Sequence, residues 1–219
     1  MQIAIIGAGN VGTALTTALT RAGHTVTITS RDPGDAARVA SATGANAVPT
    51  IADAVAGADV VIPAVPFSSF PEIASEIDGA AAGAPVVDVT NRISFGSAGP
   101  EIDPTSSNAE ELAGLLPNSP VVKAFNTLFA SRQADPFSEG IQLDGFVAGD
   151  DPGAKGTVLD LIGSIGLNPV DVGPLVRARQ LEGLAFLNMA LNIVNEGDWQ
   201  SGWKLVAAPS TTDADGGSK

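Results

Sequence analysis

The chain has 219 residues, of which 44% are hydrophobic and only 16% are charged, so it can bury one large core or a core with a small appendage. Acidic residues outnumber basic ones by 24 to 11, which gives a net charge of −13. Because a surface of that sign repels nucleic acids and anionic membranes, we expect no nucleic-acid and no membrane partner. The excess of acid fits a cytoplasm of high salt as well as an ordinary acidic cytoplasmic enzyme, and both interpretations stay open.

Several residue types that carry chemistry are missing or rare. The chain has no Cys, no Tyr and one His, His24, which we expect in a surface turn. These absences exclude disulfides, thiolate nucleophiles, Cys-ligated metals and Tyr proton donors, and any Ser-His-Asp triad would depend on His24. The composition favours a reaction with little demand for acid–base help, so we assign no catalytic acid or base and expect no metal.

Short apolar runs and helical stretches alternate along the first half of the chain, as in an α/β fold with a doubly wound parallel sheet. In chain order we predict a strand at 2–6, a helix at 10–22, a strand at 25–29, a helix at 33–42, a strand at 46–48, a helix from 50, a strand at 59–65 and a helix at 70–77. Asp32 followed by Pro33 is typical of an N-cap and a first helical turn. The chain begins with a strand rather than an apolar leader, and no apolar run reaches ~20 residues, so we expect a soluble cytoplasmic protein.

The second half continues the alternation after a strand at 85–89, although residues 92–105 lack periodicity and are predicted to form a loop. The later elements are a helix at 108–116, strands at 121–125 and 145–148, a helix at 151–165, a strand at 168–172 and a long helix at 175–194. A soft boundary at 133–143 predicts a large domain over residues 1–140 and a small α/β extension over 141–209. The polar tail, residues 210–219, is predicted to be disordered.

The strongest motif is a glycine-rich segment that directly follows the first predicted strand and opens the first helix: Gly7, Ala8, Gly9, Asn10, Val11 and Gly12. In this context the pattern is the dinucleotide-binding fingerprint of a Rossmann fold. Gly7 permits the tight turn, Gly9 lets the backbone approach a pyrophosphate, and Gly12 lets helix and strand pack closely. The helix N-terminus supplies amide donors to the phosphates.

The end of the second strand decides between NAD and NADP. An NAD site needs an acid there to bind the ribose 2′-hydroxyl, and Asp32 is the competing candidate. Because Pro33 follows it, Asp32 is better explained as a helix cap. Ser30 and Arg31 lie where a 2′-phosphate would bind, and an Arg offers a planar, charged pair of donors. The sequence therefore favours NADP.

Three later strands end at the same edge of the predicted sheet, where α/β folds bind ligands. They are followed by Val65-Pro66, by Thr90-Asn91 and by Phe125-Asn126-Thr127. None of these residues titrates. Small apolar and amide side chains suit a crevice that positions a nicotinamide and excludes water.

These residues resemble the coenzyme F420-dependent NADP oxidoreductases and their dinucleotide-binding relatives. The matching segments are IAIIGAGNVGTAL, the triplet TSR, DVVIPAVP, VVDVTN, VVKAFNT and DVGPLVRARQLEGLAFL. The resemblance extends from the first strand to about residue 205. The segments KAFNT and GPL-x-x-AR-x-LE and the pair Ser30-Arg31 are narrower signals than the glycine motif.

The resemblance implies direct hydride transfer between C4 of NADPH and C5 of the deazaflavin coenzyme F420, with the protein supplying alignment. The glycine segment would hold the pyrophosphate, and Ser30 and Arg31 the 2′-phosphate. The residues expected to flank the ribose and nicotinamide are Val65, Pro66, Asn91, Phe125, Asn126 and Thr127. We also expect a homodimer formed through the last helix.

The identity of the hydride acceptor stays open. The anionic tail of F420 should meet bases, for which the second half of the chain offers Arg132, Arg177, Arg179 and Lys204. Another acceptor, such as a flavin, an imine or a small carbonyl compound, is an alternative, as is a non-enzymatic NADP(H) sensor. An enzyme needs a second apolar pocket over the nicotinamide, and a sensor does not.

Three other residue groups in the second half have weaker assignments. Glu182 is expected in an ion pair near Arg177 and Arg179. Trp199 and Trp203 would share one face of a helix if their segment is helical, and packing is favoured over acceptor stacking. Asn188 and Asn192, polar residues in an apolar helix, bind an acceptor or complete a buried network.

Overall fold

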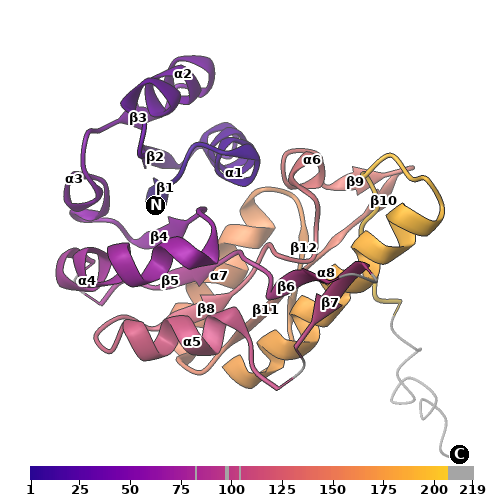
Figure 1. Cartoon of the computed structure of the whole chain (residues 1–219). Coiled ribbons are helices and arrows are strands. Elements are labelled where there is room, and N and C mark those ends of the chain that lie inside the picture. The colour runs from indigo at the N-terminus through magenta and orange to yellow at the C-terminus, as the bar shows by residue number, and fades with distance from the viewer. Residues whose placement is uncertain (82, 97–98, 104, 207–219) are drawn as a thin grey trace, which may run out of the picture.

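The computed structural model describes residues 1–81, 83–96, 99–103 and 105–206, and one large sheet lies at its centre (Figure 1). Six of its strands run parallel, and across the sheet they are β3 (Asn46–Ala47), β2 (Thr25–Thr29), β1 (Gln2–Ile6), β4 (Val60–Pro63), β5 (Val86–Asp88) and β8 (Val121–Lys123). The strand order reverses between β1 and β4. In such sheets, ligands bind beyond the carboxyl ends of the strands at this point. The predicted doubly wound Rossmann-type fold is confirmed.

Helices cover both faces of the sheet because alternate strand residues point to opposite sides. One face packs against α1 (Asn10–Arg21), α2 (Pro33–Thr43) and α7 (Pro152–Ser164). The other face packs against α3 (Ile51–Val55), α4 (Phe70–Ala80), α5 (Asn108–Leu115) and the beginning of α8 (Ala178–Val194). Along β1, Ile3 and Ile5 belong to the first core, and Ala4 and Ile6 to the second. Residues 3–6 of β1 are therefore buried, on one side of the sheet or the other.

The last two strands extend the same sheet, but the chain direction changes. β11 (Asp144–Gly149) runs antiparallel to β8, with Ala148 opposite Lys123, and β12 (Asn168–Asp171) runs parallel to β11. α7 connects these two strands as a crossover helix. The predicted C-terminal extension thus adds two strands to the same sheet as the parallel strands. The division into domains at residue 140 stays a prediction. Residues 210–219, predicted to be disordered, lie outside the described residues.

The prediction that residues 92–105 form a loop is wrong. They contain β6 (Ile93–Gly96) and β7 (Gly99–Ile102), which pair antiparallel with Ile93 opposite Ile102. The glycines and the proline belong to a hairpin, so they interrupt the apolar pattern without preventing pairing. A second small hairpin, β9 (Phe137–Ser138) and β10 (Ile141–Gln142), lies in the predicted boundary segment.

α8 is the longest helix of the described residues and crosses beside the β6–β7 hairpin (Figure 1). It follows a single helical turn at Leu175–Arg177. The chain then returns along the molecule through residues 195–206, where Trp203 O accepts a hydrogen bond from Asp144 N at 2.9 Å. Among the described residues, no helix has the length and apolar character needed to cross a membrane.

Candidate functional site: a dinucleotide crevice with a buried ion cluster behind it

The glycine-rich turn after β1 has the geometry that the sequence predicts. Gly7 has a φ of +113°, and a Cβ placed on it would overlap the carbonyl oxygen of Ala64. A Cβ on Gly12 would overlap the carbonyl oxygen of Gly7. A Cβ on Gly9, in contrast, would meet no atom within 4 Å. The first and third glycines thus allow close packing, and the second leaves open space above the turn.

The amino end of α1 is open to an anion. Gly9 is its N-cap and offers no side-chain acceptor, and the first turn carries no acidic residue. The N-caps of four other helices do accept hydrogen bonds from backbone N–H groups through their side chains: Asp32, Thr50, Ser107 and Asp151. The first-turn N–H groups of α1 therefore remain available to phosphate oxygens, and the helix dipole favours that charge.

The end of β2 lies directly beside this turn, because Gly7 N donates to Thr29 O at 2.8 Å. Asp32 accepts a hydrogen bond from Gly34 N at 2.8 Å and caps α2, as predicted. The hydroxyl of Ser30 donates to Asp32 O at 2.5 Å. Arg31 is exposed, and across the described part of the chain its guanidinium makes neither a hydrogen bond nor an ion pair. Asp32 is thus used as a helix cap, whereas the guanidinium of Arg31 is free to bind an anion beside the turn.

A cavity of about 170 Å³ lies between the start of α1, the ends of β5 and β8, and α8. It brings together five of the predicted residues: Val11, Asn91, Phe125, Asn126 and Thr127. Its other lining residues, which the sequence did not single out as nucleotide contacts, are Val89, Leu128, Phe129, Ala130, Gln133, Ala185, Asn188 and Met189. The walls are mainly apolar, as expected of a pocket that excludes water around a reacting ring.

Two amide side chains fix the geometry of one wall of this cavity. Asn126 Nδ2 donates to Asn91 Oδ1 at 2.8 Å, and Asn91 Nδ2 donates to Asn126 O at 3.3 Å. The pair joins the segments that follow β5 and β8. Phe125, which directly precedes Asn126, has a φ of +62°, which is strained for a residue with a side chain. Such strain is common where a backbone must present its neighbours to a ligand.

Val65 and Pro66 lie on the other side of the glycine turn and do not line the cavity. Val65 Cγ1 is 3.0 Å from the place where a Cβ of Gly7 would be, so it contacts the turn itself. Pro66 is exposed and precedes the short helix Phe67–Ser69. The structure therefore separates the predicted residues into the open turn with its flanks and a partly enclosed cavity beside it.

A buried ion cluster, which was not predicted from the sequence, lies behind the cavity. Lys123 and Asp88 are 0% exposed, and Glu182 is 1% exposed. Lys123 Nζ lies 2.8 Å from Asp88 Oδ2 and 2.7 Å from Glu182 Oε1. Glu182 was expected to pair with an arginine of its own helix, but its partner is Lys123, 59 positions away. A lysine inside the apolar run VVKAF and an aspartate inside VVDV were the available signals.

Burial raises the pKa of Glu182, and the charge of Lys123 works against that rise. The nearby arginine, Arg179, instead binds Glu110 through two hydrogen bonds of 2.8 and 2.6 Å. That bidentate pair, helped by Ser107, lowers the pKa of Glu110. The two carboxylates next to α5 thus differ in environment: one is buried with a lysine, and the other is partly exposed with an arginine.

The bases expected to receive an anionic acceptor tail mostly have carboxylate partners. Arg132 pairs with Asp135 at 3.0 Å, Arg179 with Glu110 at 2.6 Å, and Lys204 with Asp144 at 2.9 Å. Arg177 is exposed. A ligand carboxylate or phosphate would therefore have to compete with the protein's own acids at three of the four positions.

The segment after α8 is not helical, so Trp199 and Trp203 do not form the shared helical face considered from sequence. Trp199 packs edge-on against Phe129 of the cavity wall, with ring centroids 5.3 Å apart. Asn188 and Asn192 complete a buried network with Ser201, whose hydroxyl donates to Asn188 Oδ1 at 2.6 Å. This network ties the returning segment to α8.

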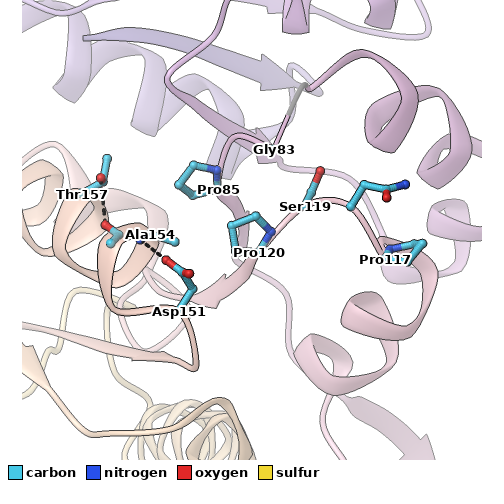
Figure 2. Close-up of a pocket in the computed structure, with 10 residues that line it drawn as sticks. Gly83, Pro85, Pro117, Ser119, Pro120, Asp151, Ala154 and Thr157 are labelled. Carbon is cyan, nitrogen blue, oxygen red and sulfur yellow. Dashed lines mark hydrogen bonds between the residues drawn. The ribbon is translucent and has the colours of Figure 1, made fainter.

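Two larger hollows exist besides the cavity. One, of about 530 Å³, lies at the amino ends of β5 and β8, where Pro85 and Pro120 face the first turn of α7 (Figure 2). The carboxylate of Asp151 there already accepts a hydrogen bond from Ala154 N at 2.7 Å. The other, of about 500 Å³, adjoins the β6–β7 hairpin and shares Asn91 with the cavity. Because parallel sheets bind ligands at the carboxyl ends of their strands, the first hollow is not the site.

Comparison with known proteins agrees with this geometry. Residues 2–92 match the family model described as NADP oxidoreductase, coenzyme F420-dependent. An F420-dependent NADP reductase of Methanothermobacter thermautotrophicus is 32% identical over 211 residues, which cover 89% of this chain and 90% of that protein. A structure from Arthrobacter sp., described as a candidate F420-dependent NADP reductase, has a TM-score of 0.84 and 29% identity and covers 94% of this chain and 99% of that one.

The rat metalloreductase STEAP3 is 33% identical over 193 residues, which cover 84% of this chain. The chain spans only 36% of the length of that relative. The archaeal reductase, by contrast, aligns over nearly its whole length. This chain therefore belongs to the coenzyme F420-dependent NADP oxidoreductase family, a family of NADP-dependent oxidoreductases.

Proposed function

We propose that the crevice binds NADP(H). The open amides at the start of α1 would hold the pyrophosphate, with contacts from the turn residues Gly7, Ala8, Gly9, Asn10, Val11 and Gly12. Ser30 and Arg31 would bind the 2′-phosphate, which the uncommitted guanidinium supports. Val65, Pro66, Asn91, Phe125, Asn126 and Thr127 would flank the ribose and the nicotinamide. The exposed face above Gly9 leaves room for this backbone approach.

We propose further that the chain is a reductase that exchanges a hydride between NADP(H) and the deazaflavin coenzyme F420. The observation that carries this proposal is the 170 Å³ cavity beside the turn, because an enzyme needs an apolar space over the reacting face of the nicotinamide. When bound, the two cofactors would supply the chemistry themselves: a proton and two electrons move together from one ring carbon to the other. The residues of the cavity wall hold the rings in line and exclude water.

The distribution of titratable groups supports a reaction with little acid–base chemistry. His24 Nε2 lies 2.8 Å from Ser164 Oγ, at the amino end of β2 and away from the crevice. Burial lowers its pKa, and the charge of the chain's amino group lowers it further. Among the described residues, the side chains that line the cavity are apolar groups, amides and the hydroxyl of Thr127, and none of them is an acid or a base. Hydride transfer from one ring to another does not require an acid or a base from the protein, so these side chains would be sufficient.

A second acceptor is favoured by one observation. Three of the four bases expected near an anionic F420 tail are held in ion pairs with carboxylates. An acceptor without such a tail, such as a flavin or a small imine or carbonyl compound, would not have to displace them. The cavity argues against a purely non-enzymatic NADP(H) sensor, which needs no second pocket.

Mixing the protein with NADPH and oxidised coenzyme F420 tests the proposal. We expect the visible absorbance of the deazaflavin to be lost. NADPH should be at least tenfold more effective than NADH, because one charged contact contributes at least roughly 1.4 kcal/mol to binding, which corresponds to a factor of ten. A protein that binds NADPH tightly but leaves F420 oxidised uses another acceptor, and reduction of a free flavin in the same assay would identify it. A protein that binds neither nucleotide would overturn both proposals.

We also propose that the protein works as a cytoplasmic homodimer. The support is a set of exposed apolar residues at the end of α8: Leu187, Leu191, Ile193 and Val194. The net charge of −13 is consistent with small-molecule ligands and no nucleic-acid partner. Sedimentation of the pure protein tests the dimer directly.

A further inference from the structure

The buried cluster of Lys123, Asp88 and Glu182 has more negative than positive groups. Lys123 Nζ donates to Asp88 Oδ2, to Glu182 Oε1 and to the carbonyl oxygen of Thr90, so all three ammonium hydrogens have acceptors. The other oxygen of Asp88 accepts from the backbone N–H of Thr90 at 2.8 Å and from its hydroxyl at 2.7 Å. Lysine is thus held as an ammonium, and aspartate as a carboxylate.

Glu182 also faces donors only. Its Oε1 accepts from Asn108 N at 2.9 Å as well as from Lys123, and its Oε2 accepts from Arg92 N at 3.0 Å. A protonated carboxyl needs an acceptor for its own hydrogen, and the surrounding backbone N–H groups offer none. Burial raises the pKa of Glu182, but these hydrogen bonds act against protonation and select the carboxylate. One ammonium with two carboxylates leaves the cluster with a net charge of −1.

This charge lies directly behind the wall of the cavity. Val89, the residue after Asp88, lines the cavity, and so does Phe125, two residues after Lys123. Because side chains alternate between the two faces of a strand, Asp88 lies on the face of β5 opposite to Val89. Glu182 lies one helical turn before Ala185, another lining residue. Burying an unbalanced charge away from water lowers the stability of the folded protein. A functional role of this charge would explain its presence here. Charges act strongly there because the surroundings are of low dielectric.

We propose that the net negative charge of the Lys123–Asp88–Glu182 cluster favours the oxidised, positively charged nicotinamide over the reduced, neutral ring and thereby promotes hydride donation by NADPH. When the dihydronicotinamide gives up a hydride, it loses one proton and two electrons to the acceptor, and its ring gains one positive charge. The three residues do not touch the ring; they act as positioning and electrostatic residues through the wall. The inference rests on the proposed binding of NADP(H) in this crevice.

The ratio of two dissociation constants tests this inference without any acceptor. NADP⁺ and NADPH carry the same phosphates, so the ratio of their Kd values reports on the ring alone. In Glu182→Gln, which removes one buried negative charge with little change of shape, we expect the Kd of NADP⁺ relative to that of NADPH to rise about tenfold. Fluorescence of bound NADPH and its displacement by NADP⁺ give both constants.

The matched control is Glu110→Gln. It is the same substitution and also removes one negative charge that is paired with a cation, but the pair Glu110–Arg179 is partly exposed and outside the cavity wall. We expect its Kd ratio to stay within about twofold of that of the native protein, because solvent screens the pair. An equal rise in both variants would overturn the inference, as would an unchanged ratio in Glu182→Gln.

Two further variants test the sign of the effect, and the salt dependence of the native protein tests it without any substitution that could cause misfolding. Asp88→Asn removes the other negative charge and should move the ratio in the same direction, whereas Lys123→Gln increases the negative charge and should lower it. In the native protein, the ratio should change by less than about twofold between 0.05 and 0.5 M salt, because a buried charge is poorly screened. A strong salt dependence would assign the preference to surface charge and contradict the proposal. Loss of NADPH binding by the native protein would instead contradict the proposed function.

Discussion

The ammonium nitrogen of Lys123 lies 2.7 Å from Oε1 of Glu182, and both side chains are completely enclosed. The contact links the end of the central strand β8 to the long helix α8 across 59 positions of sequence. Together with Asp88 it therefore joins the parallel sheet to the helix that forms the outer wall of the cavity. The geometry of that wall depends on interactions that are not local in sequence.

Replacing Lys123 by alanine should destabilise the protein severely. The change leaves two buried carboxylates without their counter-charge, which costs about 3–5 kcal/mol of the free energy of unfolding. Urea denaturation of Lys123→Ala measures the loss. Arg38→Ala is the matched control, because the Arg38–Asp35 pair is exposed and should contribute less than about 1 kcal/mol. Equal losses of unfolding free energy in the two variants would contradict the prediction that the buried cluster contributes more to stability than an exposed ion pair.

Two of the three glycines of the turn, Gly9 and Gly12, should respond differently to alanine. In Gly12→Ala, the new methyl group overlaps Gly7 O, so we expect a loss of about 1–3 kcal/mol in unfolding free energy. Gly9→Ala meets no atom within 4 Å, so it should leave stability nearly unchanged while weakening NADPH binding. Thermal denaturation and nucleotide titration separate the two effects. If Gly9→Ala binds NADPH as the native protein does, the phosphates do not approach the turn there.

Removal of the guanidinium beside the turn should discriminate between nucleotides. In Arg31→Ala we expect NADPH binding to weaken by about 1.5–3 kcal/mol, because a charged contact to the 2′-phosphate is lost. NADH, which has no such phosphate, should lose less than about 0.5 kcal/mol. Isothermal titration of both nucleotides gives the comparison. Parallel losses for the two nucleotides would remove the 2′-phosphate from this position.

Much of this site follows from local sequence signals. The glycine turn, the cap formed by Asp32 and the boundaries of β1 and β2 agree with prediction, because each depends on residues within a few positions of one another. Asn91, Phe125, Asn126 and Thr127 were expected to share one edge, since parallel strands end together, and they line one cavity. These expectations required only the strand order of the fold.

Other features depend on contacts that no local pattern reveals. The ion pairs of Lys123 span 35 and 59 positions, so an isolated lysine in an apolar strand gave no indication of its partners. The antiparallel orientation of β11 depends on how the chain crosses after β8, and its sequence is compatible with either direction. The backbone at Trp199 has a φ of +59°, which stops the helix that a spacing of four residues suggests.

The pair Glu110–Arg179 predicts a pH dependence of stability. Hydrogen bonds from Arg179 hold the pKa of Glu110 below its usual value. The stability that Glu110 contributes is therefore present above about pH 4.3, the pKa of an unfolded glutamate, and is lost as the pH falls through the lower folded pKa. Glu110→Gln should accordingly be less stable than the native protein at pH 7, by less than about 1 kcal/mol because the pair is partly exposed, and this difference should shrink at pH 3.

Thermal melting of the native protein and of Glu110→Gln at pH 7 and pH 3 measures this change. The native protein should lose more stability between the two pH values than the variant does. A difference between the two proteins that grows on acidification would mean that Glu110 binds its proton more tightly in the folded state, contrary to the lowered pKa.

A crystal structure of the complex with NADPH tests the central claim most directly. We predict that the pyrophosphate contacts the backbone amides at the start of α1, that the guanidinium of Arg31 is within hydrogen-bonding distance of the 2′-phosphate, and that the nicotinamide enters the cavity beside Asn91 and Asn126. A nucleotide bound elsewhere on the chain, or an Arg31 side chain turned into solvent while the nucleotide occupies the turn, would contradict the account.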